Sequence, residues 1–293
     1  MKPVLRSPAW TGLAAVALLT AATPLAAQEA DWTEVRARRQ VGDIQSVTVD
    51  VEYVAGELRI APADGGLLYD THLKYDAARM RPERNWSVDG DAARLDLSFE
   101  GLGDDGDMDI EFDGDDHGFL QLGLSPDVPT DLRVKVGAAL SEVELGGIPL
   151  TGLVYQTGAS NTEIRFESPN PAQMERLELA VGAAEFSATE LGNAGFGELE
   201  FTGGVGDVTL DFTGDWSKDA SAAIKMGLGS LMLVFPEDLG VRISKSGFLA
   251  SLDAPGYAKV DGAWQSPGWD SASHHLDIRL VAALGSIEVR QAD

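Results

Sequence analysis

A short motif built around glycine recurs through the chain and limits the folds that the chain can adopt. An alternating, strand-like segment leads into a glycine pair or a degraded form of it, and a second alternating segment follows. From Gly137 to Gly227 the steps between successive copies are 21, 24, 22 and 23 residues. The candidate corner glycines are Gly137, Gly158, Gly182, Gly204, Gly206, Gly227, Gly229 and Gly285. A repeat of this length indicates stacked structural units.

The segments on either side of each glycine have the pattern of half-buried β-strands. Apolar residues occupy every second position, as in Leu177, Leu179 and Val181, so one face of each strand is expected to be buried. Glycine at the corner permits a sharp turn and lets backbone pack against backbone. One such unit cannot bury its own apolar face, but stacked units bury one another's. We therefore predict an all-β fold, a β-solenoid, with an antiparallel meander or β-sandwich as the alternative.

The N-terminus has the features of an export signal. Lys2 and Arg6 precede an apolar run from Thr11 to Ala22, and small residues end at Ala27. The run is shorter than the about 20 residues that a membrane span needs, which favours a cleaved signal over an anchor. We expect a signal peptide (1–27), an extension (28–43), an N-terminal β region (44–118) with an acidic loop (101–118), and a solenoid repeat region (119–293) with a capping insertion (235–275).

The composition argues against several classes of partner and cofactor. The chain has 47 acidic and 22 basic residues, for a net charge of −25, which disfavours nucleic acid and anionic membranes. It has no cysteine, which excludes disulfides, zinc–thiolate sites and iron–sulfur clusters. After signal removal we expect a protein of the periplasm, cell surface or medium, without stable membrane insertion.

Several stretches of the chain resemble known bacterial families. Glu57–Ile60, Leu122–Pro129 and the glycine repeats resemble the toast-rack proteins and their adhesin-like repeat region. Val260–Trp264, followed by Leu276–Leu280 and Leu284–Val289, resembles the end of the LiaF-like domain of the cell-wall-active antibiotic response. The resemblance covers roughly residues 45–293 and implies a right-handed, mostly parallel β-solenoid outside the cell, without established catalytic residues. Two corners depart from the pattern, with alanines at 138–139 and 183–184.

The acidic loop offers the sequence's weak candidate for a cation site. Asp105, Asp107, Asp109 and Glu111 alternate, so they could project to one side of a strand and offer oxygen ligands to calcium. The alternative is a solvated loop held open by repulsion among its carboxylates. The same loop begins with a G-x-G-x-x-G match at 101–106, but the acids that follow would repel a phosphate, so we predict no cofactor.

Other candidate residues support no specific chemistry. The histidines His72, His117, His274 and His275 occur in no metal-binding or hydrolase motif. Glycosidases use two carboxylates, but the sequence cannot select a pair from so many acids. Trp86, Trp216, Trp264 and Trp269 could form a sugar-stacking surface, although tryptophans in a solenoid are more often core or cap residues.

Three functions remain compatible with the sequence. The first, favoured because no catalytic signature is present, is a non-catalytic exported scaffold that binds a cell-surface or extracellular macromolecule, such as a protein or glycan of the envelope. The second is an extracytoplasmic component of an envelope-stress or cell-wall-antibiotic response. The third is a β-helical carbohydrate-active enzyme.

Overall fold

The structure is a computed structural model that describes residues 30–102 and 117–292. The predicted signal peptide and the cation candidates Asp105, Asp107, Asp109 and Glu111 lie outside the described residues. The described part is built from strands and two short 3-10 helices, namely β1 (Trp32–Gln40), β2 (Ser46–Pro62), β3 (Leu67–Asp76), β4 (Met80–Asp89), β5 (Ala92–Gly101), β6 (Phe119–Leu124), β7 (Thr130–Glu144), β8 (Leu150–Arg165), β9 (Met174–Thr189), η1 (Leu191–Ala194), β10 (Phe196–Asp211), β11 (Ala220–Phe235), β12 (Leu239–Asp253), β13 (Ala258–Val260), β14 (Ala263–Gln265), η2 (Trp269–Ser271) and β15 (His274–Gln291).

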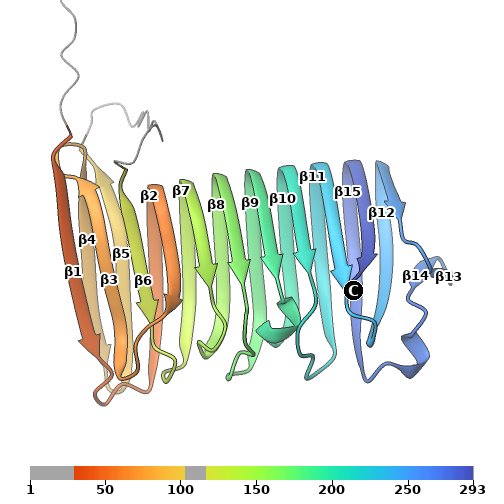
Figure 1. Cartoon of the computed structure of the whole chain (residues 1–293), viewed down its shortest axis with the longest axis horizontal. Coiled ribbons are helices and arrows are strands. Elements are labelled where there is room, and N and C mark those ends of the chain that lie inside the picture. Colours follow the sequence, from red (N-terminus) through yellow and green to blue (C-terminus); the bar gives the residue numbers. More distant parts are fainter. Residues whose placement is uncertain (1–29, 103–116, 293) are drawn as a thin grey trace, which may run out of the picture.

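The long strands stack into a parallel ladder that runs the length of the molecule (Figure 1). Their spatial order is β2-β7-β8-β9-β10-β11-β15-β12, and every neighbouring pair in this series is parallel. This arrangement confirms the predicted all-β, mostly parallel solenoid and is incompatible with the antiparallel alternative. The ladder begins at β2, which belongs to the expected N-terminal β region (44–118) and not to the expected repeat region (119–293).

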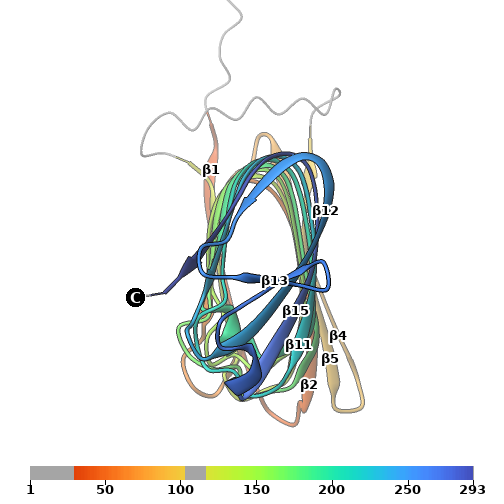
Figure 2. The same cartoon turned by 90° about the vertical axis from the view of Figure 1, so that its right-hand side faces the viewer.

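Each long strand forms most of one rung by bending over in its middle. Seen along the long axis in Figure 2, the strands rise on one side, arch over and descend on the other, so the rungs enclose a flattened core. In β10 the ladder pairing runs to Gly203, skips Gly204 and resumes at Val205. The arch therefore falls at the glycine motif, and the connections between rungs lie on the opposite, turn side.

The arches pack so closely that a side chain has no room at the first glycine of the motif. A Cβ atom on Gly158 would lie 2.8 Å from the carbonyl oxygen of Gly137, and one on Gly182 would lie 2.6 Å from that of Gly158. A Cβ atom on Gly204 would lie 2.5 Å from the carbonyl oxygen of Gly182. At the second position Gly206, Gly229 and Gly285 also have positive φ angles of 142°, 133° and 138°. The glycines are therefore required by backbone geometry as well as by space.

The core consists of columns of like residues stacked from rung to rung. Leu132, Leu153, Leu177 and Leu199 pair in register, and none exposes more than 1% of its surface. Buried aromatic side chains also stack, since Phe212 lies on Phe235 with ring centroids 5.2 Å apart. Each fully buried side chain of this size stabilises the fold by about 1.5–3 kcal/mol, so the columns supply the main driving force for stacking.

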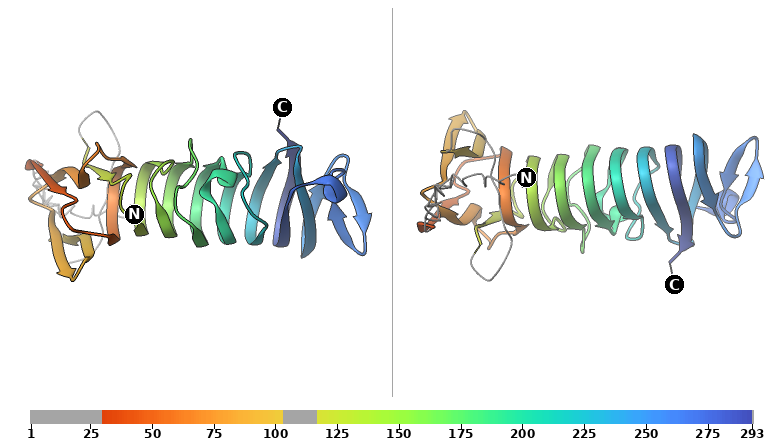
Figure 3. Two further views of the ribbon diagram at one scale, coloured as in Figure 1. Left: turned by 90° about the horizontal axis from the view of Figure 1, so that it is seen from below. Right: turned by 90° about the horizontal axis from the view of Figure 1, so that it is seen from above.

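Beyond β2 the sheet divides into two arms, which diverge in Figure 3. The first half of β2 pairs with β5, which forms an antiparallel hairpin with β4. The second half of β2 pairs with β6, which continues to β3 and β1. Arg39 of β1 lies over the ring of Trp86 in β4, 4.2 Å from the ring centroid, so a cation–π contact bridges the two arms.

At the other end the chain order and the spatial order differ. The segment 235–275 forms β12 as the last rung, then the β13–β14 hairpin and η2, and the chain returns as β15 between β11 and β12. β14 pairs with β12 at Arg242 and Ile243. Lys245 of β12 occupies a column that Phe201, Ile224 and Leu280 fill in the preceding rungs. A further rung would have to bury the ammonium group of Lys245. An inward-pointing charge on the last strand is a common protection of sheet edges against further pairing.

We expect Gly204→Ala to destabilise the protein by about 1–3 kcal/mol, because the new methyl group would press on the backbone of the neighbouring arch. Thermal unfolding followed by circular dichroism measures the effect. Gly65→Ala is the matched control, since a Cβ atom there meets nothing within 4 Å, and it should change stability by less than about 0.5 kcal/mol. Equal melting temperatures for the two variants would refute the close-packing role of the arch.

Candidate binding surface

The four histidines do not come together in one site, and three of them have a local partner. His72 Nε2 lies 2.9 Å from a carboxylate oxygen of Glu34, and His117 Nε2 lies 3.1 Å from one of Glu57. His275 Nε2 lies 3.0 Å from the backbone oxygen of Trp269. Within residues 30–102 and 117–292, no group of three or more histidines and acids has a geometry that could hold a metal ion. The histidines therefore indicate local structure rather than a shared site.

The four tryptophans singled out in the sequence do not form one surface. Trp86 lies on β4 at the N-terminal end, whereas Trp264 and Trp269 lie beyond β12 at the other end. Trp86, Trp216 and Trp264 are partly buried against the core. Trp269 packs edge-on against His275 and under Arg242, whose guanidinium carbon is 4.4 Å from the ring centroid. Trp216 combines core packing with a position in a surface hollow, described below.

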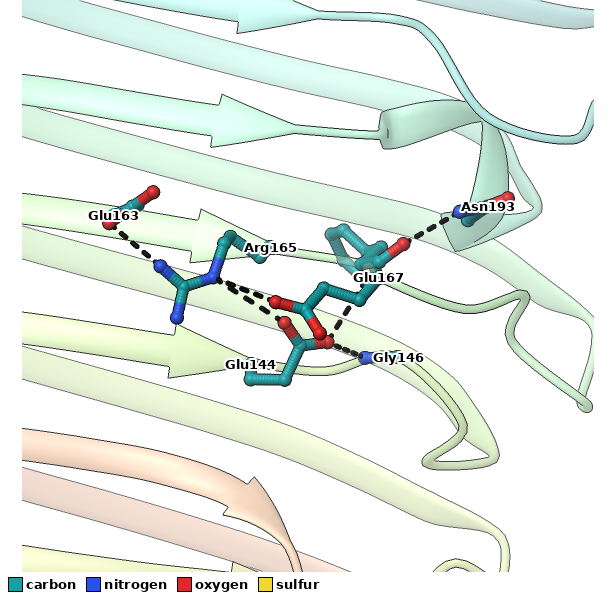
Figure 4. Close-up of polar contacts among 7 residues, drawn as sticks. Glu144, Gly146, Glu163, Arg165, Glu167 and Asn193 are labelled. Carbon is teal, nitrogen blue, oxygen red and sulfur yellow. Dashed lines mark hydrogen bonds and ion pairs between the residues drawn. The ribbon is translucent and has the colours of Figure 1, made fainter.

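A charged cluster joins β7 to β8 on the turn side of the ladder (Figure 4). Arg165 Nη1 lies 2.9 Å from Glu163, and Arg165 Nε lies 3.6 Å from both Glu144 and Glu167. Glu144 Oε1 also accepts hydrogen bonds from the backbone N–H groups of Gly146 and Glu167, at 2.7 and 3.1 Å. The hydrogen bond with Glu163, and then the charges of all three carboxylates, raise the pKa of Arg165. Because its groups hold one another and the backbone, we interpret the cluster as a clamp between rungs.

Glu190 lies next to this clamp in an unfavourable environment. Burial, followed by the negative charges of Glu144, Glu167 and Asp211, raises the pKa of its carboxyl group above the ordinary 4.5. The residue also has a left-handed backbone conformation, with φ of 56°. Its ionised side chain therefore opposes folding at neutral pH.

The described part of the chain has a polar hollow of about 490 Å³ on the turn side near the C-terminal end. Three connections form its walls: the one between β10 and β11, the one between β11 and β12, and the segment around η2 that leads into β15. Its polar and aromatic lining side chains include Trp216, Asp215, Glu237, Asp238, Ser271 and His274. Residues that are far apart in the sequence are thus brought together at one place.

Hydrogen bonds hold the wall that carries Trp216. Asn193, 7% exposed, accepts a hydrogen bond from the backbone N–H of Asp215 at 2.7 Å and donates one to the carbonyl of Phe166 at 2.7 Å. Trp216 Nε1 donates to the carbonyl of Phe212 at 2.8 Å, and its ring meets Phe196 edge-on with centroids 5.7 Å apart. The tryptophan is therefore fixed in place before any ligand arrives.

The side chains of this hollow offer hydrogen-bond acceptors beside an aromatic ring. Asp215, Glu237 and Asp238 are exposed, and no described cation forms an ion pair with any of them. Exposed carboxylates accept hydrogen bonds from hydroxyl groups, and an aromatic ring supplies an apolar surface to a sugar or side chain.

A scan against protein families matches the chain twice to the same model, the N-terminal domain of toast_rack (DUF2154), at residues 27–176 and 174–234. The chain belongs to the toast-rack family. The two matches cover most of the rack and end before β12. Residues 235–293, which carry the resemblance to the LiaF-like domain, lie outside them, so that resemblance stays a prediction.

Solved structures with similar folds include proteins named as proposed adhesins. One is a proposed cell adhesion protein from Clostridium sporogenes, with 14% identity, a TM-score of 0.46, and coverage of 89% of this chain and 100% of that chain. Another is a proposed adhesin from Bacteroides fragilis, with 13% identity, a TM-score of 0.31, and coverage of 88% and 97%. No curated protein is similar enough in sequence to count as a match.

We expect Glu190→Gln to stabilise this toast-rack protein at neutral pH, raising the melting temperature by about one or two degrees. The raised pKa means that folding disfavours the ionised form, so the gain is present at neutral pH and disappears as the pH falls through the folded-state pKa. Melting curves over a pH series measure it. Glu185→Gln removes an exposed carboxylate on β9, the strand that ends just before Glu190, and controls for the change in net charge. An equal gain from both variants would contradict the local explanation.

Proposed function

We propose that this toast-rack protein is a non-catalytic, exported scaffold that binds an extended macromolecule of the cell envelope, a polysaccharide or a protein segment rich in hydroxyl groups. The observation that carries the proposal is the turn-side hollow, in which a fixed tryptophan lies beside a serine hydroxyl and three exposed carboxylates that form no ion pair with a described cation. The apparent export signal in residues 1–27 supports a location outside the cytoplasm.

The geometry favours recognition of a polymer over that of a small molecule. The hollow is open and polar, whereas small-molecule sites are mostly apolar and bury most of the ligand. A sugar unit resting on Trp216 would leave its neighbours free to extend along the turns of adjacent rungs. Hydrogen bonds from the polymer's hydroxyl groups to the carboxylates would then orient the polymer, and the ring would supply contact area. Within the described residues no helix is long and apolar enough to cross a membrane.

The experiment compares two double variants for binding to a panel of purified envelope polysaccharides. Glu237→Gln/Asp238→Asn should weaken binding by about tenfold, because two charged hydrogen-bond acceptors become neutral. Glu198→Gln/Asp277→Asn changes the net charge equally at exposed positions on β10 and β15, outside the hollow, and should bind like the wild type.

Two results would contradict the proposal. Equal binding by both double variants would show that the hollow is not the binding surface. Release of shortened sugar chains, detected by chromatography after incubation, would show that the protein is an enzyme and would favour the third function considered for the sequence.

A further inference from the structure

A row of exposed aliphatic side chains follows the arch of the last four rungs. Val205, Leu228, Leu284 and Leu249 expose 53%, 46%, 43% and 61% of their surfaces. They are neighbours in the ladder, since Val205 pairs with Leu228, Leu228 with Leu284, and Leu284 with Leu249. We call this row the aliphatic ridge. The right-hand view of Figure 3, from above, shows the arches of these strands toward the C-terminal end.

The arch itself does not require large side chains at these positions. Each ridge residue of β10 and β11 stands between two glycines, so nothing beside it covers its side chain. Three earlier rungs place alanine in the same column, at Ala138, Ala159 and Ala183, and bend in the same way. Single exposed aliphatic residues are ordinary, but a contiguous row marks an interaction surface.

The surroundings of the ridge carry little net charge although the chain as a whole is strongly acidic. The described side chains that flank it are mostly small or hydroxyl-bearing, with the exposed Val281 among them. The charged groups there are Asp207 and the ion pair of Lys225 with Glu200, 3.5 Å apart. Elsewhere on the surface two copies would repel each other, since each carries a net charge of −25. Along the ridge they can approach without that penalty. A single base is too few to hold an anionic lipid surface against the charge of the chain.

The spacing of the ridge also selects its partner. Its side chains repeat at the distance between neighbouring strands, about 4.8 Å. A second copy has the same repeat, so the side chains of one ridge can fit between those of the other over several rungs. Contacts of this kind are self-complementary, as a twofold interface requires. We propose that the aliphatic ridge is a self-association surface that pairs two copies of this protein ridge to ridge.

Pairing through the ridge avoids the obstacle at the end of the rack. Stacking a second copy on β12 would bury Lys245, and β14 already covers part of that edge. Four half-exposed side chains fall short of the about 800 Å² per partner of a standard interface, so the association is weak and responds to concentration. It concerns contacts between copies and is independent of the polymer target proposed above.

The absence of natural cysteines permits a direct test. We expect Leu228→Cys to form disulfide-linked dimers under mild oxidation many times faster than Leu140→Cys. Leu140 is a matched control because it is 51% exposed and lies on β7, outside the ridge. Sedimentation velocity over a concentration series supplies an independent measurement, in which Leu228→Thr/Leu284→Thr should abolish a concentration-dependent shift that Leu140→Thr retains.

Three outcomes would overturn the proposal. Equal cross-linking at both positions, with sedimentation of the wild type independent of concentration, would show that the copies do not pair. Self-association that the ridge variant retains would place the contact elsewhere. Ridge-dependent co-sedimentation with phosphatidylcholine vesicles, without self-association, would identify lipid as the occupant. Melting curves of each variant confirm that it is folded.

Discussion

The close approach of backbone to backbone at the arches is the constraint on which the rest of the structure depends. Where Gly204 passes over Gly182 there is no room for a Cβ atom, so the strand can fold over within a single residue position. Both halves of every strand then face the same narrow core. A core this thin is filled by its own side chains, which leaves the surface and the turns as the places where binding chemistry can be presented.

The turns can vary because the ladder does not depend on their sequence. Backbone hydrogen bonds and stacked apolar columns hold the strands, whereas each turn is held by its own polar contacts. Arg165 with its three carboxylates joins β7 to β8, and Asn193 ties the end of β8 to the loop that carries Trp216. Such contacts are made within and between adjacent turns, so neighbouring turns can differ and together form a hollow that no single repeat contains.

More of the strand pattern than of the candidate sites could be predicted from the sequence. Alternation and recurring glycines predict strands, arches and stacking, because burial and close packing leave a periodic trace. The hollow leaves no such trace, since Trp216, Glu237 and Ser271 come from three separate connections. The Arg165 clamp was also missed, because its carboxylates look like the many other acids of the chain. The row of ridge residues becomes visible only when the register is known.

The sequence by itself determined that this protein would be built from strands with glycine at their corners, stacked as repeated units, because those properties follow from the local rules of alternation and backbone sterics. That the strands pair in parallel was implied only by the resemblance to the toast-rack proteins. Only the tertiary structure decided which rungs are neighbours at the C-terminal end. β15 inserts between β11 and β12 and places Leu284 between Leu228 and Leu249. Backbone hydrogen bonds between strands are nearly independent of residue type, so strand order depends on how the whole chain packs and is not encoded in any one repeat.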